Sequence, residues 1–274
     1  KIPGVNLRMN YRNHRKMMVV DAKVAYLGGF NIGDEYLGKG ELGEWRDTHM
    51  KIEGNAVLTL QSRFFMDWNA VAKEKNRKDY AEAYFPIADK KGNTAMQIVT
   101  SGPDDEDQTI KMGFLKMISQ AKESIYIQTP YFIPDESLHE MLKIAVLSGV
   151  KVKIMIPSKP DHPFVYRATE YFAKDIVEYG AEVYMYQNGF LHSKVMVVDD
   201  EIVSVGTANM DVRSFKLNFE INAFIYDRDV AEELIANFDE DQKNCIRATH
   251  DYFAKQSKWR KFKQAFSRLL SPIL

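Results

Sequence analysis

Apolar and polar positions in the central part of the chain alternate between the helical period and the strand period. The apolar positions of residues 110–121 recur at helical spacing and predict a helix. The same patterns predict further helices over 136–148 and 164–179, and strands over 124–128, 150–156 and 181–186. Gly180 follows the last of these helices, where a glycine commonly ends one. This alternation favours a sheet flanked by helices.

The flanking regions contain the same two types of element. Strands are predicted over 5–9, 190–198, 203–206 and 220–227, a helix over about 229–247, and an amphipathic helix over 55–73. Residues 74–95 are polar, and we expect a linker that ends near Gly92. The strand over 5–9 matches the strand over 181–186, but the strands and helices that precede residue 181 have no counterpart before residue 5. We therefore expect two α/β halves, the first of which is truncated at its N-terminus.

One stretch of the sequence occurs twice. Residues 13–31 align with residues 191–209 without a gap. The aligned pairs are His14 with His192, Lys16 with Lys194, Asp21 with Asp199, Gly28 with Gly206, and Asn31 with Asn209. Agreement of so many polar and glycine positions over so short a stretch indicates a duplicated half-site. The alternative, a buried hairpin with incidental polar residues, would suit a single copy better than a pair.

The composition excludes several classes of protein. Of the 274 residues, 45% are hydrophobic and 27% are charged, as in an ordinary globular protein. The net charge of −1 provides no global basic field, so no nucleic-acid partner is expected. The one cysteine, Cys245, cannot form an internal disulfide, which favours a reducing, cytoplasm-facing compartment. The chain begins on Lys1 rather than Met, so we expect it to be part of a longer protein.

The duplicated motif, His-x-Lys-x4-Asp, contains the candidate catalytic residues. Alternate side chains of a strand share a face, so the His and Lys of each copy should point the same way. Asp21 and Asp199 have the opposite parity, and we expect them to have an orienting or structural role. The small pairs Gly28–Gly29 and Gly206–Thr207 are expected to leave room for a ligand. Asn31 and Asn209 follow these pairs and are expected to bind phosphate.

Two such units that face each other would suit a phosphodiester. The lysines and asparagines can bind the non-bridging oxygens. One neutral histidine can attack phosphorus while the other, protonated, delivers a proton to the leaving oxygen. Asp47 and Glu220 each begin an apolar strand shortly after the asparagine, and we expect them to orient the histidines. The acidic run 104–107 is expected to be a solvated loop, so no metal or other cofactor is expected.

These motifs resemble the phospholipase D superfamily, whose signature is HxKxxxxD followed by GxxN, usually twice per site. Finer stretches resemble its bacterial cardiolipin synthase branch: NYRNHRK, WRDTH, QTPYFIPD, IPSKPDH, GTANMDVRSFKLNFE and RLLSPIL. The resemblance implies two α/β/α half-domains related by pseudo-twofold symmetry, with a phosphohistidine intermediate and no metal. Residues 1–92 would be the C-terminal part of the first half-domain, and 93–274 the second half-domain with a basic amphipathic tail.

The resemblance also implies an activity and a location. The reaction would be phosphatidyl transfer between two phosphatidylglycerol molecules, giving cardiolipin and glycerol, with His14 as nucleophile and His192 as general acid. Hydrolysis, by a phospholipase D or a phosphodiesterase or nuclease of the same superfamily, is the alternative. Full-length members usually carry N-terminal membrane helices, so a cytoplasm-facing site at the cell membrane is expected. The oligomeric state is left open.

The C-terminal segment is basic and amphipathic. Its apolar residues recur at helical spacing, its basic residues occupy the other faces, and no Asp or Glu follows Asp251. The apolar residues are Trp259, Phe262, Phe266, Leu269 and Leu270. A segment of this kind suits the interface of an anionic membrane. The alternative is a helix packed on the domain with its basic face in solvent.

Overall fold

The structure, a computed structural model, describes residues 11–87 and 90–271. The strand expected over residues 5–9 lies outside the described residues. The strands are β1 (Arg12–Asn13), β2 (Met17–Val20), β3 (Val24–Gly28), β4 (Trp45–Arg46), β5 (His49–Glu53), β6 (Ala95–Ser101), β7 (Ser124–Gln128), β8 (Phe132–Ile133), β9 (Lys151–Pro157), β10 (Glu182–Tyr186), β11 (Phe190–Leu191), β12 (Val195–Val198), β13 (Ile202–Gly206), β14 (Met210–Asp211), β15 (Asn218–Tyr226) and β16 (Cys245–Arg247).

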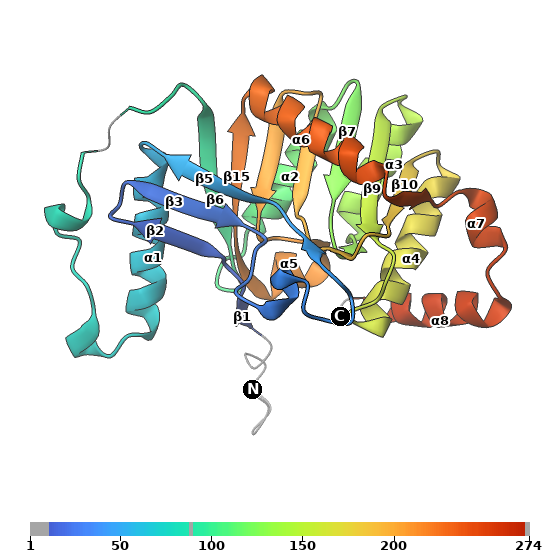
Figure 1. The fold of residues 1–274 in the computed structure, drawn as a ribbon, viewed down its shortest axis with the longest axis horizontal. Helices are drawn as coiled ribbons and strands as arrows, with labels where there is room; N and C mark the ends of the chain where they lie inside the picture. The colour runs from blue at the N-terminus through green and yellow to red at the C-terminus, as the bar shows by residue number, and fades with distance from the viewer. Residues whose placement is uncertain (1–10, 88–89, 272–274) are drawn as a thin grey trace.

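The helices alternate with these strands, as the sequence pattern predicts (Figure 1). They are α1 (Ala56–Val71), α2 (Thr109–Gln120), α3 (Glu136–Leu147), α4 (Pro163–Glu178), α5 (Val212–Lys216), α6 (Arg228–Gln242), α7 (His250–Ala254) and α8 (Lys258–Leu269), with 3-10 turns η2 (Asp34–Leu37), η3 (Glu74–Asn76) and η4 (Glu82–Tyr84). Side chains cap several helices at their expected starts. Asp135, for example, accepts a hydrogen bond from the backbone of Leu138 at the start of α3.

Two sheets form the centre of the molecule. Within the described residues, nine strands form one mixed sheet in the order β1–β15–β13–β12–β7–β9–β10–β16, with β6 also paired to β15. The first copy of the motif supplies β2 and β3 of a smaller antiparallel sheet, β2–β3–β5, which packs against one face of the large sheet. The α/β fold class predicted from the sequence is confirmed.

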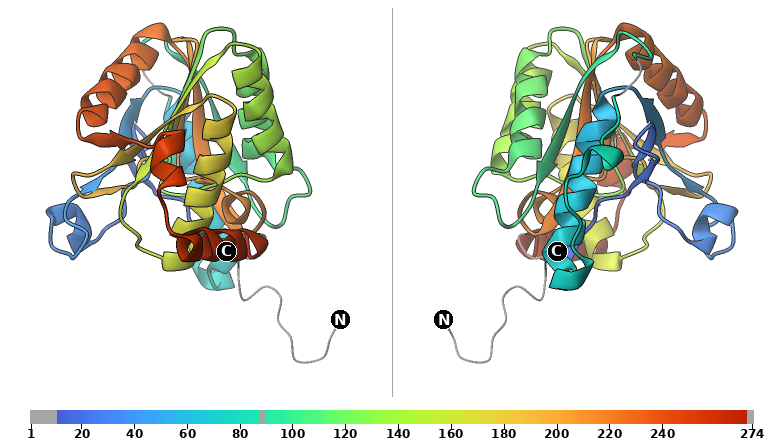
Figure 2. Two further views of the ribbon diagram at one scale, coloured as in Figure 1. Left: turned by 90° about the vertical axis from the view of Figure 1, so that its right-hand side faces the viewer. Right: turned by 90° about the vertical axis from the view of Figure 1, so that its left-hand side faces the viewer.

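Both faces of the large sheet are covered. Val195 and Val197 of β12 pack toward the small sheet and α6, whereas Met196 and Val198 pack toward α2, α3 and α4. Figure 2 shows these helices on two sides of the sheet. A strand buried on both faces is apolar at every position, which explains the unbroken Val-Met-Val-Val run.

The motif histidines and lysines do not lie inside a continuous strand, so the strand predicted over 190–198 is wrong in its middle. The chain leaves β11 at Leu191 and enters β12 at Val195. The backbone changes partner at this point: β11 pairs with β4, whereas β12 pairs with β7 and β13. The change of partner leaves residues 192–194 outside regular pairing, where their side chains are directed by neighbouring segments.

The helix predicted over 229–247 is also too long. α6 ends at Gln242, and β16 then pairs antiparallel with β10. Strand β10 would otherwise leave an edge of unpaired backbone groups, and β16 satisfies them. Cys245 therefore lies on an edge strand rather than on a helix.

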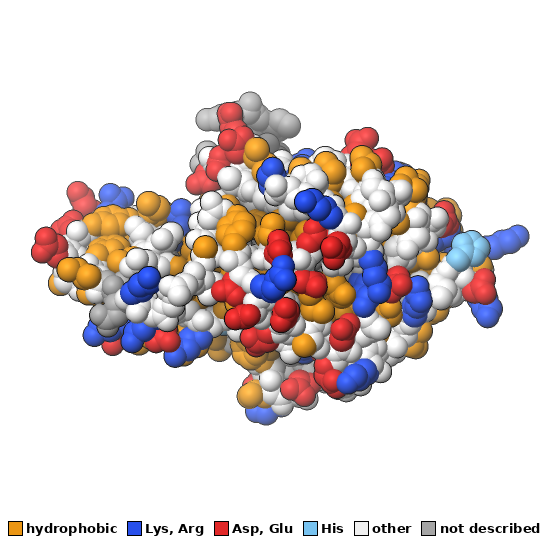
Figure 3. Space-filling model, turned by 90° about the horizontal axis from the view of Figure 1, so that it is seen from above, with side chains coloured by type: hydrophobic (Ala, Val, Ile, Leu, Met, Phe, Trp, Pro, Cys, Tyr) orange, Lys and Arg blue, Asp and Glu red, His pale blue; other side chains and the backbone are white. Residues whose placement is uncertain are grey.

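The surface carries mixed charge. Figure 3 views the end of the molecule at the top of Figure 1, where Asp and Glu side chains are interspersed with Lys and Arg. Among the helices that the structure describes, no helix is both long and apolar enough to cross a membrane.

Candidate active site

Strand register places each motif histidine beside a carboxylate from the other half of the chain. β1 pairs in parallel with β15, with Asn13 opposite Phe219, so that His14 and Glu220 come next in both chains. β11 pairs in parallel with β4, with Leu191 opposite Arg46, and His192 and Asp47 come next. The same arrangement thus occurs twice: a histidine of the first half meets a carboxylate of the second, and a histidine of the second half meets a carboxylate of the first.

The first pair is His14 with Glu220. His14 Nδ1 lies 2.8 and 3.0 Å from the two carboxylate oxygens, and the Glu220 side chain is fully buried. Asn218 Nδ2 donates to the same carboxylate at 3.0 Å, and the Thr207 hydroxyl donates to it as well. A carboxylate held in this way fixes the orientation of the imidazole and leaves Nε2 for chemistry.

The second pair is His192 with Asp47. His192 Nδ1 lies 2.7 Å from Asp47 Oδ2 and 2.8 Å from the hydroxyl of Tyr36, which donates to the same carboxylate oxygen at 2.9 Å. The backbone N–H of Thr48 donates to Asp47 Oδ1 at 2.8 Å. The two half-sites therefore have the same plan but different supporting groups.

The two histidines differ in burial. The His14 side chain is 28% exposed, whereas that of His192 is 7% exposed. Burial, together with the nearby ammonium groups of Lys194 and Lys16, lowers the pKa of His192 to about 3 against the opposing effect of Asp47. His192 is accordingly neutral in the free protein near neutral pH.

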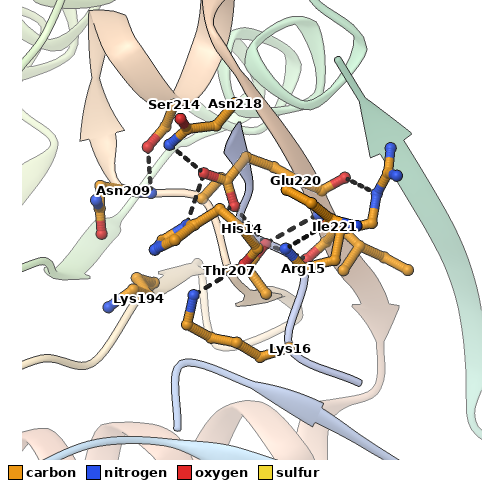
Figure 4. A network of polar contacts seen from close by, with 12 residues as sticks. His14, Arg15, Lys16, Lys194, Thr207, Asn209, Ser214, Asn218, Glu220 and Ile221 are labelled. Carbon is orange, nitrogen blue, oxygen red and sulfur yellow. Dashed lines mark hydrogen bonds and ion pairs between the residues drawn. The ribbon is translucent and has the colours of Figure 1, made fainter. Parts of the chain in front are cut away.

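Both motif lysines lie at the same centre. Lys16 Nζ donates to the carbonyl oxygen of His14 at 2.8 Å, and Lys194 Nζ makes the equivalent bond to His192. Figure 4 shows Lys16 and Lys194 beside the imidazole of His14. Burial lowers the pKa of Lys16 to about 8 and that of Lys194 to about 7, although Glu220 and Asp47 oppose the shift. Two desolvated cations at one centre are suited to binding an anion.

The two asparagines are placed differently. Asn209 is buried next to this centre, and its Oδ1 has no hydrogen-bond partner among the described residues. A buried amide oxygen without a partner is unusual and is available to a hydrogen-bond donor. Asn31 is only half-buried, whereas Asn209 is buried.

The two motif aspartates lie away from the centre. Each begins the turn of a hairpin, β2–β3 or β12–β13, with φ of +53° at Asp21 and +51° at Asp199. The Asp199 carboxylate accepts three backbone hydrogen bonds of 2.8–2.9 Å, from residues 122–124 at the start of β7. Asp21 is exposed. Asp199 thus connects the hairpin to the neighbouring strand and touches neither histidine.

The glycines have another role than the one predicted. A Cβ atom at Gly28 would lie 2.4 Å from the carbonyl oxygen of Thr48, and one at Gly29 would lie 2.2 Å from Asp47 Oδ1. A Cβ atom at Gly206 would lie 2.4 Å from the carbonyl oxygen of Ile221. These glycines therefore permit the close approach of the strand that carries the carboxylate, not of a ligand.

Sequence reasoning missed several supporting residues. Tyr36 lies on η2, in a segment for which no element was predicted, and Asn218 lacks a motif of its own. Thr207 was expected to leave room for a ligand, whereas its hydroxyl donates to Glu220. Arg46 makes a bidentate pair with Asp241 of α6, at 3.0 and 2.9 Å, and holds the β4 segment against the second half. The available signal was position, because Tyr36, Arg46, Thr207 and Asn218 each lie within a few residues of a predicted site residue.

The described residues contain no group of three or more His, Cys, Asp or Glu side chains that could hold a metal ion. The acidic run at 104–107 is a loop with internal hydrogen bonds, such as that from the backbone N–H of Asp107 to Asp105 Oδ1 at 3.1 Å. The side chains at the site are two imidazoles, two ammoniums, two carboxylates and an amide.

The chain is similar to known proteins. Residues 114–242 match a family described as "Cardiolipin synthase, PLD-like domain". The chain is 57% identical to the cardiolipin synthase of Listeria welshimeri, 56% identical to that of Staphylococcus aureus and 55% identical to the major cardiolipin synthase of Bacillus subtilis, in each case over the whole of this chain. It spans little more than half of these relatives, 57%, 56% and 57% of their respective lengths.

The fold also matches a solved structure, the phosphatidylserine synthase of Haemophilus influenzae, with a TM-score of 0.71. The alignment covers 96% of this chain and 71% of that one at 16% identity, so it supports the fold alone. Each histidine of the paired site is held by a carboxylate from the other half of the chain. Residues 114–242 match the PLD-like domain of cardiolipin synthases, and the chain as a whole is similar to cardiolipin synthases.

Proposed function

We propose that the protein is a cardiolipin synthase, a phosphatidyltransferase that uses two phosphatidylglycerol molecules as donor and acceptor. The observation that carries the proposal is the crossed pair of histidine–carboxylate contacts around two buried lysines. The identity of 55–57% to cardiolipin synthases supports this lipid substrate over others. The domain limits of 1–92 and 93–274 remain our interpretation of the two halves.

In the first step His14 Nε2 attacks the phosphorus of one phosphatidylglycerol. The bond from phosphorus to the glycerol oxygen breaks, His192 gives that oxygen a proton, and free glycerol leaves a phosphatidyl group on His14. The greater exposure of His14 suits the group that must reach phosphorus.

In the second step the hydroxyl of another phosphatidylglycerol gives its proton to His192 and its oxygen attacks phosphorus. The phosphorus–nitrogen bond breaks, cardiolipin forms, and the protonated His192 loses its proton when cardiolipin leaves. Lys16, Lys194 and the side-chain N–H groups of Asn209 bind the non-bridging oxygens, on which charge develops.

The acid role of His192 requires a bound anion. Its pKa in the free protein is lowered to about 3, by burial and then by Lys194, so the free protein holds it neutral. A phosphodiester anion beside the imidazole favours the protonated form and opposes both causes. Proton uptake is thereby coupled to substrate binding.

The experiment is product identification with phosphatidylglycerol vesicles. Full-length enzyme should yield cardiolipin and glycerol, and His14→Ala should yield neither. Phosphatidic acid as the main product would instead indicate a hydrolytic phospholipase D, because water would then have replaced the lipid hydroxyl. Absence of turnover by the full-length enzyme would contradict the proposal.

The expected surroundings belong to the same proposal. Phosphatidylglycerol is a membrane lipid, so the site must work at a bilayer, and we place that site on the cytoplasmic side of the cell membrane. The N-terminal membrane helices usual in the family would supply an anchor in the full-length protein.

A further inference from the structure

Helix α8 packs on the domain through its polar side, unlike an ordinary surface helix. Its polar residues Gln264 and Ser267 are buried against the domain. Its large apolar residues are exposed: Trp259, Phe262, Phe266 and Leu269. An amphipathic surface helix normally buries its apolar side, so this orientation requires a reason. The sequence alternatives were a membrane helix or a helix packed on the domain, and α8 is packed with its apolar side still outward.

A buried carboxylate holds the polar side of α8 on the domain. Glu170 of α4 is 1% exposed. Arg260 donates to it through Nη2 and through Nε at 3.3 Å, and Gln264 Nε2 donates at 3.1 Å. Gln256, just before α8, adds a contact at 3.4 Å. Because a buried carboxylate without partners is costly, these contacts fix which side of α8 faces inward.

The exposed side of α8 is flanked by cations. Lys258, Lys261, Lys263 and Arg268 lie on the helix, and no Asp or Glu follows Asp251. Lys263 Nζ lies 5.6 Å from the centre of the Trp259 ring. The opposite end of the molecule carries acidic and basic side chains together (Figure 3). An apolar row with a basic border complements an anionic lipid surface, where the rings enter the interface and the ammoniums meet the headgroups.

The position of α8 agrees with such a surface. Figures 1 and 2 place α8 at the lower end of the molecule. β1, which directly precedes His14, and α5, which follows Asn209, lie at the same end in Figure 1. A bilayer that contacted α8 would therefore lie at the end of the molecule that carries β1 and α5, next to His14 and Asn209 in the sequence.

We propose that the outward side of α8, formed by Trp259, Phe262, Phe266 and Leu269, is a docking surface for an anionic bilayer. The inference extends the proposed function, because it names how this chain meets the lipid phase that holds its substrate. The occupant is the lipid interface. A second copy of the chain, or another part of a longer protein, would be a different outcome of the test.

The test measures co-sedimentation of the 274-residue chain with phosphatidylserine vesicles. Phosphatidylserine supplies negative charge without being the proposed phosphatidyl donor, so binding is separated from turnover. We expect the parent chain to bind these vesicles more tightly than phosphatidylcholine vesicles, and less tightly as salt is raised. The double variant Phe262→Ser/Leu269→Ser should bind at least about tenfold more weakly.

A matched control lies on α3. Leu147 is 69% exposed and Leu269 is 70% exposed, and Ile144 is a second exposed apolar residue on α3. Ile144→Ser/Leu147→Ser removes comparable apolar surface and should change vesicle binding less than about twofold. Trp259 fluorescence, assigned by subtracting the spectrum of Trp259→Phe, should shift to the blue on addition of phosphatidylserine vesicles.

Three results would overturn the inference. The first is unchanged vesicle binding by the α8 variant, and the second is equal loss in the α3 variant. The third is a parent chain that self-associates in a concentration-dependent way that the α8 variant abolishes, because the surface would then be an interface between copies. Transferase activity is measured separately, so unchanged vesicle binding by the α8 variant, with intact chemistry, counts against this inference alone.

Discussion

At the scale of single residues, two copies of one motif have acquired different surroundings. Glu220 is supported by Thr207 and Asn218, whereas Asp47 is supported by Tyr36 and the backbone of Thr48. His14 remains partly open and His192 is enclosed. This asymmetry gives physical content to the proposal that the two histidines have different roles.

The roles can be separated with an activated substrate. A nitrophenyl phosphodiester needs no proton on its leaving oxygen, so loss of the general acid should matter less than loss of the nucleophile. The activity of His192→Ala relative to the parent enzyme should be roughly 10²-fold or more higher with this substrate than with phosphatidylglycerol. His14→Ala should remain inactive with both substrates. Release of nitrophenol measures both. The reverse pattern would make His192 the nucleophile.

Tyr36 should act as a positioning residue. Tyr36→Phe removes the hydroxyl that bridges Asp47 and His192, and we expect kcat/KM to fall about tenfold, as for loss of one hydrogen bond to a charged group. The His192 ring resonances in an NMR spectrum should shift in the same variant. Tyr226→Phe, which removes an exposed hydroxyl bonded to Gln97, serves as the control and should change neither.

The lysines predict a pH dependence. A lysine is cationic below its pKa, and burial brings the pKa of Lys16 to about 8 and that of Lys194 to about 7. The free enzyme therefore loses its anion-binding charge as pH rises through about 7 to 8. We expect kcat/KM to fall in that window, and kcat to fall at higher pH because bound phosphate stabilises the ammoniums. A kcat/KM profile that stays flat through this window would contradict the lysine assignment.

At the scale of elements, the hairpin occurs twice, so the same substitution can be compared at equivalent positions of its two copies. Asp21 and Asp199 occupy the same turn position with nearly the same positive φ, so an alanine meets the same backbone strain at both. Asp199 alone of the two accepts the three backbone bonds from residues 122–124. Asp199→Ala should lower the free energy of unfolding by about 2 kcal/mol more than Asp21→Ala. Equal losses in urea denaturation would show that the bonds contribute little.

The elements themselves were largely predictable. The helices over 109–178 and the strands between them follow from apolar periodicity, because each element is long and buries one side or both. The errors lie where tertiary contacts override local pattern. Residues 192–194 leave the strand because β11 and β12 have different partners, and α6 ends early because β16 completes the edge of β10.

At the scale of the whole molecule, the two halves complete each other. Each histidine takes its carboxylate from the other half, so neither half holds a complete site. Arg46 and Asp241 add an ion pair across the same boundary. The packing of the two sheets is therefore a condition for chemistry as well as for stability.

The crossed pairing can be observed directly. Asp47→Asn should perturb the imidazole NMR signals of His192 and leave those of His14 nearly unchanged, because Asp47 Oδ2 contacts the former ring. Glu220→Gln should do the reverse. Assigned histidine spectra of the two variants measure this. Perturbation of the histidine within the same half would contradict the crossed arrangement.

The sequence by itself determined the duplicated motif, the α/β class and the two carboxylates, because each is visible as spacing or periodicity along one chain. It could not determine that Asp47 serves His192 and Glu220 serves His14. That choice depends on the parallel pairing of β1 with β15 and of β4 with β11, between segments more than a hundred residues apart. The outward side of α8 was likewise decided in three dimensions, because a buried Glu170 on another helix selects which side packs inward.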